Sequence, residues 1–229
     1  KAVTAGDILP FFDHWNLIAG DGSNVGNASI LEHKDFFYTA NDEAGDWVVF
    51  KSPNAGNTHG TSNNIRTELA QLKKWSAFTA NKLSATLKVM NVSATGDARV
   101  AASYSVVVGQ IHSADGHENE PLKIFYKKFP GHDKGSVFWH YEINTAGDDN
   151  SGRWDYSTAA WGDDFSAMGK EENTYPAEPL GGIALGEEFS YEIKVDDGIM
   201  HLTFKSEGHE TKTFTKNLIK SEYSSKDNI

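Results

Sequence analysis

Short runs of β-branched and aromatic residues alternate along this sequence with turns rich in Gly, Asn, Asp and Pro, and almost no stretch shows a helical period. Such runs favour β-strands. Two of them, residues 189–195 and 199–205, flank Asp196-Asp197-Gly198, and an Asp-Gly pair favours a tight hairpin turn. Many short strands at regular spacing predict an all-β fold, an antiparallel jelly-roll β-sandwich. A sandwich of this length is often one domain, so we expect a single domain over residues 1–229.

The other elements follow from the same patterns. Residues 1–15 predict a short helical turn or packed arm, and residues 65–72 fit either a strand or a helix. Residues 82–92 and 99–112, with Gly96-Asp97 between them, predict a hairpin. The segment 52–64 is rich in Gly and Asn and predicts a mobile surface loop. Further strands are expected at residues 15–18, 36–39, 47–51, 136–143 and 212–214.

Residues 145–185 break this rhythm. They are rich in Gly, Asp, Asn and Trp and show no clear period, and a segment this long without a period is usually functional or disordered. Trp154, Tyr156 and Trp161 favour a functional segment, because aromatic rings stack on sugar faces. Packing of these rings onto the sandwich is an equal alternative.

The formal net charge of −11 argues against nucleic acid as a partner, because nucleic acids are bound by basic surfaces. It does not exclude an anionic ligand, since local residues set the potential of a cleft. Lysines gather around the polar strands and either line a groove or lie on solvated strand edges; they are Lys73, Lys74, Lys123, Lys127, Lys128 and Lys134. No apolar run approaches the ~18 residues of a membrane span, and there is no cysteine.

Residues 104–128 carry the polar side chains that most suggest a site. Alternation along the first strand places Gln110 and His112 on one face and Ile111 on the other. After a polar loop, the second strand has two lysines on one face and apolar residues on the opposite one: Lys123 and Lys127 against Leu122, Ile124 and Tyr126. On these residues alone, a half-exposed sheet with ordinary polar side chains is the simpler interpretation.

Arg66, Gln110 and His112 together match one reaction type. A guanidinium suits a carboxylate, an amide can donate a hydrogen bond, and an imidazole can take a proton near neutral pH. Removing a proton next to a carboxylate is difficult unless the negative charge is neutralised. In a uronic-acid polymer, proton removal with loss of the β-substituent breaks the glycosidic bond and leaves a C4=C5 double bond. The residue types permit this chemistry without being specific for it.

Two motifs resemble a known family. Arg66-Thr67-Glu68-Leu69 resembles the R-[TS]-E-[LV]-R motif of alginate lyases of polysaccharide lyase family seven, and Gln110-Ile111-His112 resembles their Q-[IV]-H motif. Residues 121–127, Pro-Leu-Lys-Ile-Phe-Tyr-Lys, are similar to the strand that follows in that family. Order and approximate spacing also agree, and two motifs are more specific than one. Family eighteen is similar as well, and one sequence does not separate the two.

The resemblance implies a jelly roll with a substrate groove on its concave sheet, no obligatory metal or cofactor, and endo-acting cleavage of alginate. It implies that Arg66 and Gln110 neutralise the uronate carboxylate and that His112 is the base at C5. Ile111 suggests that guluronate-containing blocks are accepted. Substrate-binding roles are expected for Glu68, Lys74, Lys123, Lys127, Tyr126 and Tyr141. Of these, Glu68 is expected to act by pairing with a neighbouring Arg or Lys.

The sequence departs from the family pattern in two places. The last residue of the first motif, usually Arg, is Ala70, and Lys73 or Lys74 could replace its charge. The family's late Y-F-K-x-G-x-Y strand, whose second Tyr protonates the leaving oxygen, is not found, and we expect a further C-terminal segment to carry it. Tyr141 and Tyr126 are the weaker candidates, and core packing is the expected role of both.

Two other functions fit a β-sandwich. A non-catalytic carbohydrate-binding module would use the aromatic residues and lysines without needing Arg66, Gln110 and His112 together. A jelly-roll glycoside hydrolase needs two carboxylates about 5–9 Å apart, and the usual E-x-D-x-x-E signature is absent. The lyase prediction brings with it a secreted or periplasmic bacterial enzyme, acting as a monomer on alginate, with no nucleic-acid or membrane partner.

Overall fold

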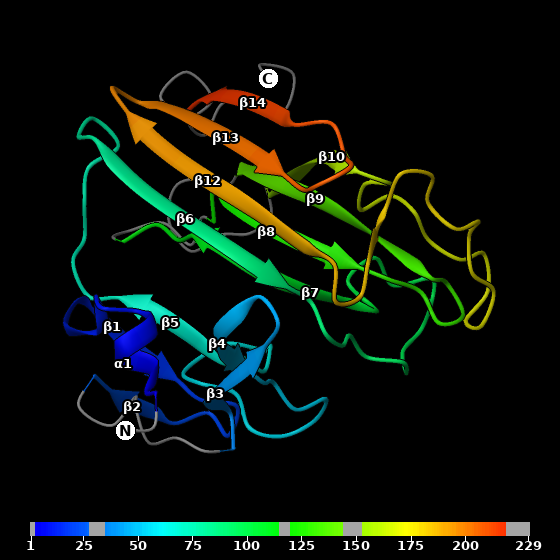
Figure 1. Cartoon of the computed structure of the whole chain (residues 1–229). Coiled ribbons are helices and arrows are strands. Elements are labelled where there is room, and N and C mark those ends of the chain that lie inside the picture. Colours follow the sequence, from blue (N-terminus) through cyan, green and yellow to red (C-terminus); the bar gives the residue numbers. More distant parts are fainter. Residues whose placement is uncertain (1–2, 28–34, 115–119, 144–152, 219–229) are drawn as a thin grey trace. The chain divides into compact units, whose positions relative to one another are not determined.

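The computed structural model describes residues 3–27, 35–114, 120–143 and 153–218 of the chain. The chain divides into two compact units, Lys1–Lys74 and Trp75–Ile229, and each unit has its own sheets (Figure 1). No helix in the described ranges is long and apolar enough to cross a membrane. The segment before Trp15 forms α1 and a single 3-10 turn, which confirms the predicted helical turn near the start of the chain.

The elements have the following bounds. The helical elements are α1 (Ala5–Ile8) and η1 (Phe12–His14), and the strands of the first unit are β1 (Trp15–Ile18), β2 (Asn24–Gly26), β3 (Phe37–Asp42), β4 (Gly45–Phe50) and β5 (Glu68–Gln71). The strands of the second unit are β6 (Asn81–Lys88), β7 (Ser105–Ile111), β8 (Leu122–Lys127), β9 (Lys134–Ile143), β10 (Trp154–Trp161), β11 (Ile183–Ala184), β12 (Glu188–Asp196), β13 (Ile199–Lys205) and β14 (Lys212–Asn217).

The first unit contains the antiparallel sheet β2-β1-β5 and the hairpin β3-β4. Its small core is formed by the buried residues Ala5, Phe12, Leu17 and Phe37. The segment 65–72, which fits either a helix or a strand by pattern, contains strand β5. Leu69 of β5 lies opposite Leu17 of β1 and packs against this core, so burial of an apolar pair favours the strand.

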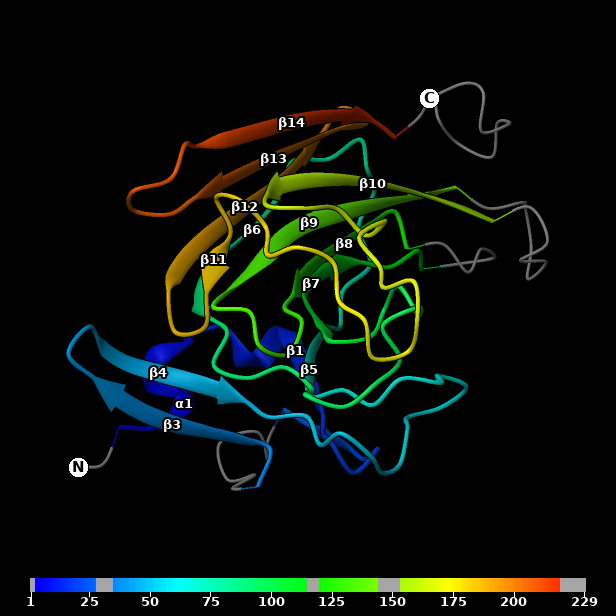
Figure 2. The ribbon, with the colours of Figure 1, turned by 90° about the vertical axis from the view of Figure 1, so that its right-hand side faces the viewer.

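The second unit is an antiparallel β-sandwich. One sheet has the order β10-β9-β8-β7, with β11 paired to β9, and the other has the order β14-β13-β12-β6. Figure 2 shows them as two layers. Apolar side chains from both sheets form one core, among them Leu122 and Ile124 from β8 and Leu202 and Phe204 from β13. The predicted all-β antiparallel sandwich is therefore confirmed.

The β12–β13 hairpin forms as predicted. Its register pairs Asp196 with Ile199, so Asp197 and Gly198 make the turn. Both turn residues have positive φ, 49° and 74°. A two-residue turn of this handedness matches the twist of the flanking strands, which is why Asp-Gly marks it in sequence.

A β-bulge in β7 determines which of its side chains face the core. Val107 lies opposite Phe125, but Gly109 lies opposite Ile124, so Val108 is the extra residue. After the bulge, Gly109 shares the core face with Ile124, and Gln110 shares the outer face with Lys123. Gly109 has no side chain to clash there, whereas a Cβ would lie 2.6 Å from the Tyr191 hydroxyl oxygen.

Two expectations about the strands of this unit are wrong. Residues 82–92 and 99–112 do not form a hairpin, because β6 pairs with β12 and β7 pairs with β8, in different sheets. The segment 145–185 is not simply an irregular insertion, since β10 within it pairs with β9 along its length. Trp161 is buried in the sandwich core, whereas Trp154 is exposed at the start of the strand. Residues 145–152 of that segment lie outside the described residues.

Candidate functional site

Polar side chains form a row across the outer face of the β10-β9-β8-β7 sheet. The register pairs Gln110 with Lys123, Lys123 with His140, and His140 with Ser157. Residues directly opposite in an antiparallel pair share one face of the sheet. Ile111 instead packs against the core. The predicted opposition of Gln110 and Ile111 is thus confirmed, and the bulge in β7 places Gln110 on the outer face.

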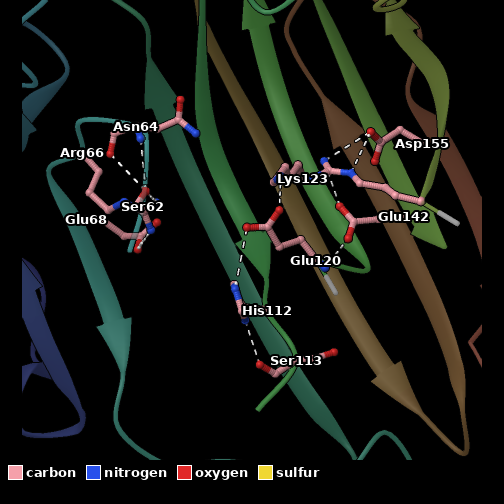
Figure 3. A network of polar contacts seen from close by, with 11 residues as sticks. Ser62, Asn64, Arg66, Glu68, His112, Ser113, Glu120, Lys123, Glu142 and Asp155 are labelled. Carbon is pink, nitrogen blue, oxygen red and sulfur yellow. Dashed lines mark hydrogen bonds and ion pairs between the residues drawn. The ribbon is translucent and has the colours of Figure 1, made fainter. Parts of the chain in front are cut away.

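His112 follows β7 directly, and its side chain is 53% exposed. The ring nitrogen Nδ1 lies 2.8 Å from the carbonyl oxygen of Ser113 (Figure 3). A carbonyl can only accept a hydrogen bond, so Nδ1 carries the hydrogen of the neutral ring. The lone pair then lies on Nε2, which makes Nε2 the atom that can take a proton.

The His112 imidazole and the Lys123 ammonium both lie beside the carboxylate of Glu120. His112 Nε2 lies 3.7 Å from Oε1, and Lys123 Nζ forms an ion pair with Oε2 (Figure 3). Lys123 is predicted to bind substrate, but its ammonium is engaged by this carboxylate. Nothing in the sequence pattern marks Glu120, because it lies outside both recognised motifs.

Glu142 extends this network across the sheet. Its Oε1 accepts a hydrogen bond from the backbone N–H of Glu120 at 3.4 Å, and its Oε2 lies 3.0 Å from Arg153 Nη2. The same guanidinium lies 3.3 Å from Asp155, the residue opposite Glu142 on β10. Burial raises the pKa of Glu142 to about 6, although the Arg153 charge opposes the shift.

His140 lies in the same row but among aromatic rings. Its ring centre lies 4.7 Å from that of Phe125 and 4.4 Å from that of Phe165. It is buried, and Nε2 has no hydrogen-bond partner among the described residues. Burial lowers the pKa of His140 to about 4, because the apolar surroundings disfavour the charged ring. The buried, neutral His140 is thus not suited to act as a base on a surface-bound polymer.

His140 should make the fold sensitive to acid. Between pH 6.5 and 4 the unfolded chain takes up a proton that the folded chain does not, so stability falls as the pH falls. The loss approaches about 3 kcal/mol at pH 4. We expect His140→Leu to remove this loss of stability, measured by urea unfolding at pH 7 and pH 4.5.

Glu142 changes the free energy of unfolding in the opposite direction between pH 4.5 and 6, because its pKa is raised in the folded chain. This contribution is present in both the wild type and His140→Leu, so it cancels in the comparison. The exposed His201→Leu is the control, and parallel pH curves for wild type and His140→Leu would contradict the assignment.

Arg66 belongs to the first unit. Its Nη2 donates a hydrogen bond of 2.5 Å to the Ser62 hydroxyl, and its Nη1 lies 3.5 Å from Glu68 Oε1 (Figure 3). The expected pairing of Glu68 with a neighbouring Arg is confirmed. The backbone beside Arg66 is held by Thr67, whose N–H donates to Ser52 Oγ and whose hydroxyl donates to the Lys51 carbonyl. These contacts orient a guanidinium that stays partly exposed.

That Arg66, Gln110 and His112 meet at one substrate carboxylate stays a prediction. Arg66 belongs to the first unit, whereas Gln110 and His112 belong to the second. The same holds for the exposed Lys74, which ends the first unit. The predicted concave groove and the substrate-binding role of Glu68 likewise remain predictions.

Three residues predicted to bind substrate are buried, which contradicts that role. The Tyr126 hydroxyl donates to the Ile183 carbonyl inside the molecule, and Tyr141 is part of the sandwich core. Core packing, the expected alternative for both tyrosines, is confirmed. Lys127 Nζ donates to the carbonyls of Ala101 and Ala167, and burial lowers its pKa to about 8. Alternation placed Lys127 on the outer face correctly, but that face is covered there.

Among the residues that the structure describes, no group of three or more His, Cys, Asp or Glu side chains is arranged to hold a metal ion. The network around Glu120 and Glu142 contains Lys123 and Arg153, and these cations neutralise the carboxylates that a metal would need.

Comparisons with known proteins agree with the geometry. A sequence model of the alginate lyase family matches residues 9–228, which span both units. An alginate lyase of Klebsiella pneumoniae is 28% identical over 250 residues, covering 92% of this chain and 76% of that protein. The crystal structure of the exolytic PL7 alginate lyase from Zobellia galactanivorans superposes with a TM-score of 0.93 at 61% identity, covering 98% of this chain and 72% of that one. The Klebsiella enzyme structure superposes with a TM-score of 0.73 at 24% identity, over 93% and 84% of the two chains, which supports the jelly-roll fold.

Proposed function

This chain belongs to the alginate lyases of polysaccharide lyase family seven, and on that premise we propose that Arg66, Gln110 and His112 carry its reaction. Family membership makes the protein a polysaccharide lyase, which leaves no role for the alternatives of a glycoside hydrolase or a non-catalytic binding module. The observation that carries the residue assignment is the state of His112: an exposed imidazole with its lone pair on Nε2, two residues after the outward-facing Gln110.

The proposed reaction is a β-elimination. His112 Nε2 takes the proton from C5 of the uronate, the electron pair forms the C4=C5 double bond, and the C4–O bond breaks. Arg66 and Gln110 bind the carboxylate at C6 and neutralise the charge that develops on it. The leaving oxygen takes a proton from an acid. A tyrosine is the expected acid, and the burial of Tyr126 and Tyr141 argues against these two.

The mode of cleavage has two candidates. The sequence resemblance implies endo-acting cleavage, but the Zobellia enzyme, 61% identical to this chain, is exolytic. We favour exolytic cleavage because the two proteins share this identity over 98% of this chain and superpose with a TM-score of 0.93. Guluronate-containing blocks are the favoured substrate. Ile111 packs against the core, so its influence on block choice is exerted through the position of Gln110 and His112. Because alginate is an extracellular polymer, we also propose that the enzyme is exported.

Incubation with alginate tests function and mode together. We expect ultraviolet absorbance from the new conjugated double bond to rise, faster on polyguluronate than on polymannuronate. Exolytic cleavage should release very short products from the start while the viscosity of the polymer falls slowly. A rapid loss of viscosity with a broad range of product sizes would establish endo-acting cleavage instead. New reducing ends without ultraviolet absorbance would contradict β-elimination itself.

A further inference from the structure

We propose that Glu120 is a positioning residue for His112: its carboxylate faces the imidazole and stabilises the imidazolium that forms when His112 takes the C5 proton. This inference rests on the proposed role of His112 as the base. Glu120 does not touch substrate in this proposal, and it acts only through the ring that it faces.

The geometry favours this role because Glu120 faces the nitrogen that changes charge. Nδ1 of His112 is occupied by the Ser113 carbonyl, and Nε2 faces Glu120 Oε1 at 3.7 Å. That separation is too long for a hydrogen bond, so the lone pair of Nε2 remains available. Once Nε2 is protonated, a negative charge at this distance attracts the cationic ring. Glu120 thus interacts more strongly with the state after proton transfer than with the state before it, which is the condition for helping catalysis.

Glu120 is itself held in place by the sheet. Its backbone N–H donates to Glu142 Oε1, and the Glu142 side chain is only 1% exposed. Glu142 is fixed by Arg153, which also contacts Asp155. These contacts fix the position of Glu120 and keep its carboxylate beside the His112 ring, which a solvated loop residue would not do.

Lys123 explains how a carboxylate can lie beside a base that acts on a polyanion. An unpaired Glu120 would repel the uronate carboxylates, and the ion pair of its Oε2 with the Lys123 ammonium weakens that repulsion at longer range. The other oxygen, Oε1, is the one that faces His112 Nε2. The ion pairs that start at Glu120 involve Lys123 from β8, and the contact of its backbone with Glu142 from β9 continues to Arg153 and to Asp155 of β10.

The variant Glu120→Gln removes the charge and keeps the shape. We expect kcat on alginate to fall about tenfold with KM changed less than about twofold, because ground-state binding is untouched. Glu120→Asp keeps the charge and should retain most of the wild-type kcat, so that the loss of activity follows the charge.

Glu192→Gln is the matched control, because Glu192 pairs with Lys82 at 3.7 Å on the other sheet. It should leave kcat and KM unchanged. Wild-type kcat in Glu120→Gln, together with a large loss of kcat in His112→Ala, would overturn the positioning role while leaving the base assignment intact. Full activity in His112→Ala would instead overturn the base assignment, and with it the catalytic meaning of Glu120.

Discussion

Replacing His112 by alanine is expected to lower kcat on alginate by about 10²–10⁴-fold, the range typical for loss of a general base. The side chain is exposed and follows the last residue of β7, so its removal leaves no cavity and should not change the thermal unfolding midpoint. The measurement is the initial rate of ultraviolet absorbance with saturating polyguluronate. KM should change little, because the imidazole acts on C5 and not on the carboxylate.

His201→Ala is the control for this variant. His201 is an exposed histidine on β13, in the sheet opposite His112, and its ring contacts only Thr215 in the hydrogen bonds of the described chain. It should retain full activity. Activity of the His112→Ala protein within about threefold of wild type would refute the base assignment, since a water molecule cannot replace a positioned base that well.

Arg66→Lys is expected to lower kcat/KM by about 10–100-fold. Lysine keeps the positive charge, so the loss of kcat/KM measures the contribution of the planar guanidinium, which can bind both oxygens of a carboxylate. Ser62 and Glu68 already orient this fork by contacts to Nη2 and Nη1, and a lysine cannot make both contacts. The effect should shrink on methyl-esterified alginate, because an uncharged ester needs less neutralisation.

Arg99→Lys is the matched control, because Arg99 also pairs with a carboxylate two residues away, Asp97, at 2.7 Å. It should leave activity unchanged. An Arg66→Lys protein with wild-type kcat/KM would show that the first unit does not contribute its guanidinium to the substrate carboxylate. An equal loss on free and esterified polymer would place the role of Arg66 in folding and not in neutralisation.

The sequence predicts most strands but fewer of their partners. Local composition marks β1, β9, β12 and β13, because β-branched and aromatic runs between turn residues are a local signal. It misassigns the β6–β7 pair, since the choice between a hairpin and a crossing to the other sheet depends on burial of distant residues. It also misses β10, where the Trp154–Trp161 strand has no simple alternation and gains its place by pairing with β9.

The candidate site is predicted unevenly for the same reason. Alternation correctly gives the face of Gln110 and Lys127, but it does not show that the outer face near Lys127 is covered by the Ala101 and Ala167 backbone. Glu120 and Glu142 carry no motif, so their contacts with His112 and Arg153 emerge only when β7, β8, β9 and β10 are aligned.

The bulge at Val108 gives this strand one residue that its partner strand does not match. Val107 lies opposite Phe125 and Gly109 opposite Ile124, so loss of Val108 would restore regular pairing and leave Gln110 opposite Lys123 on the outer face. Loss of a residue after the bulge would instead shift the pairing by one position and turn the following side chains to the opposite face of the sheet. Surface loops usually tolerate gain or loss of residues, but in this strand natural changes of length should be confined to the bulge.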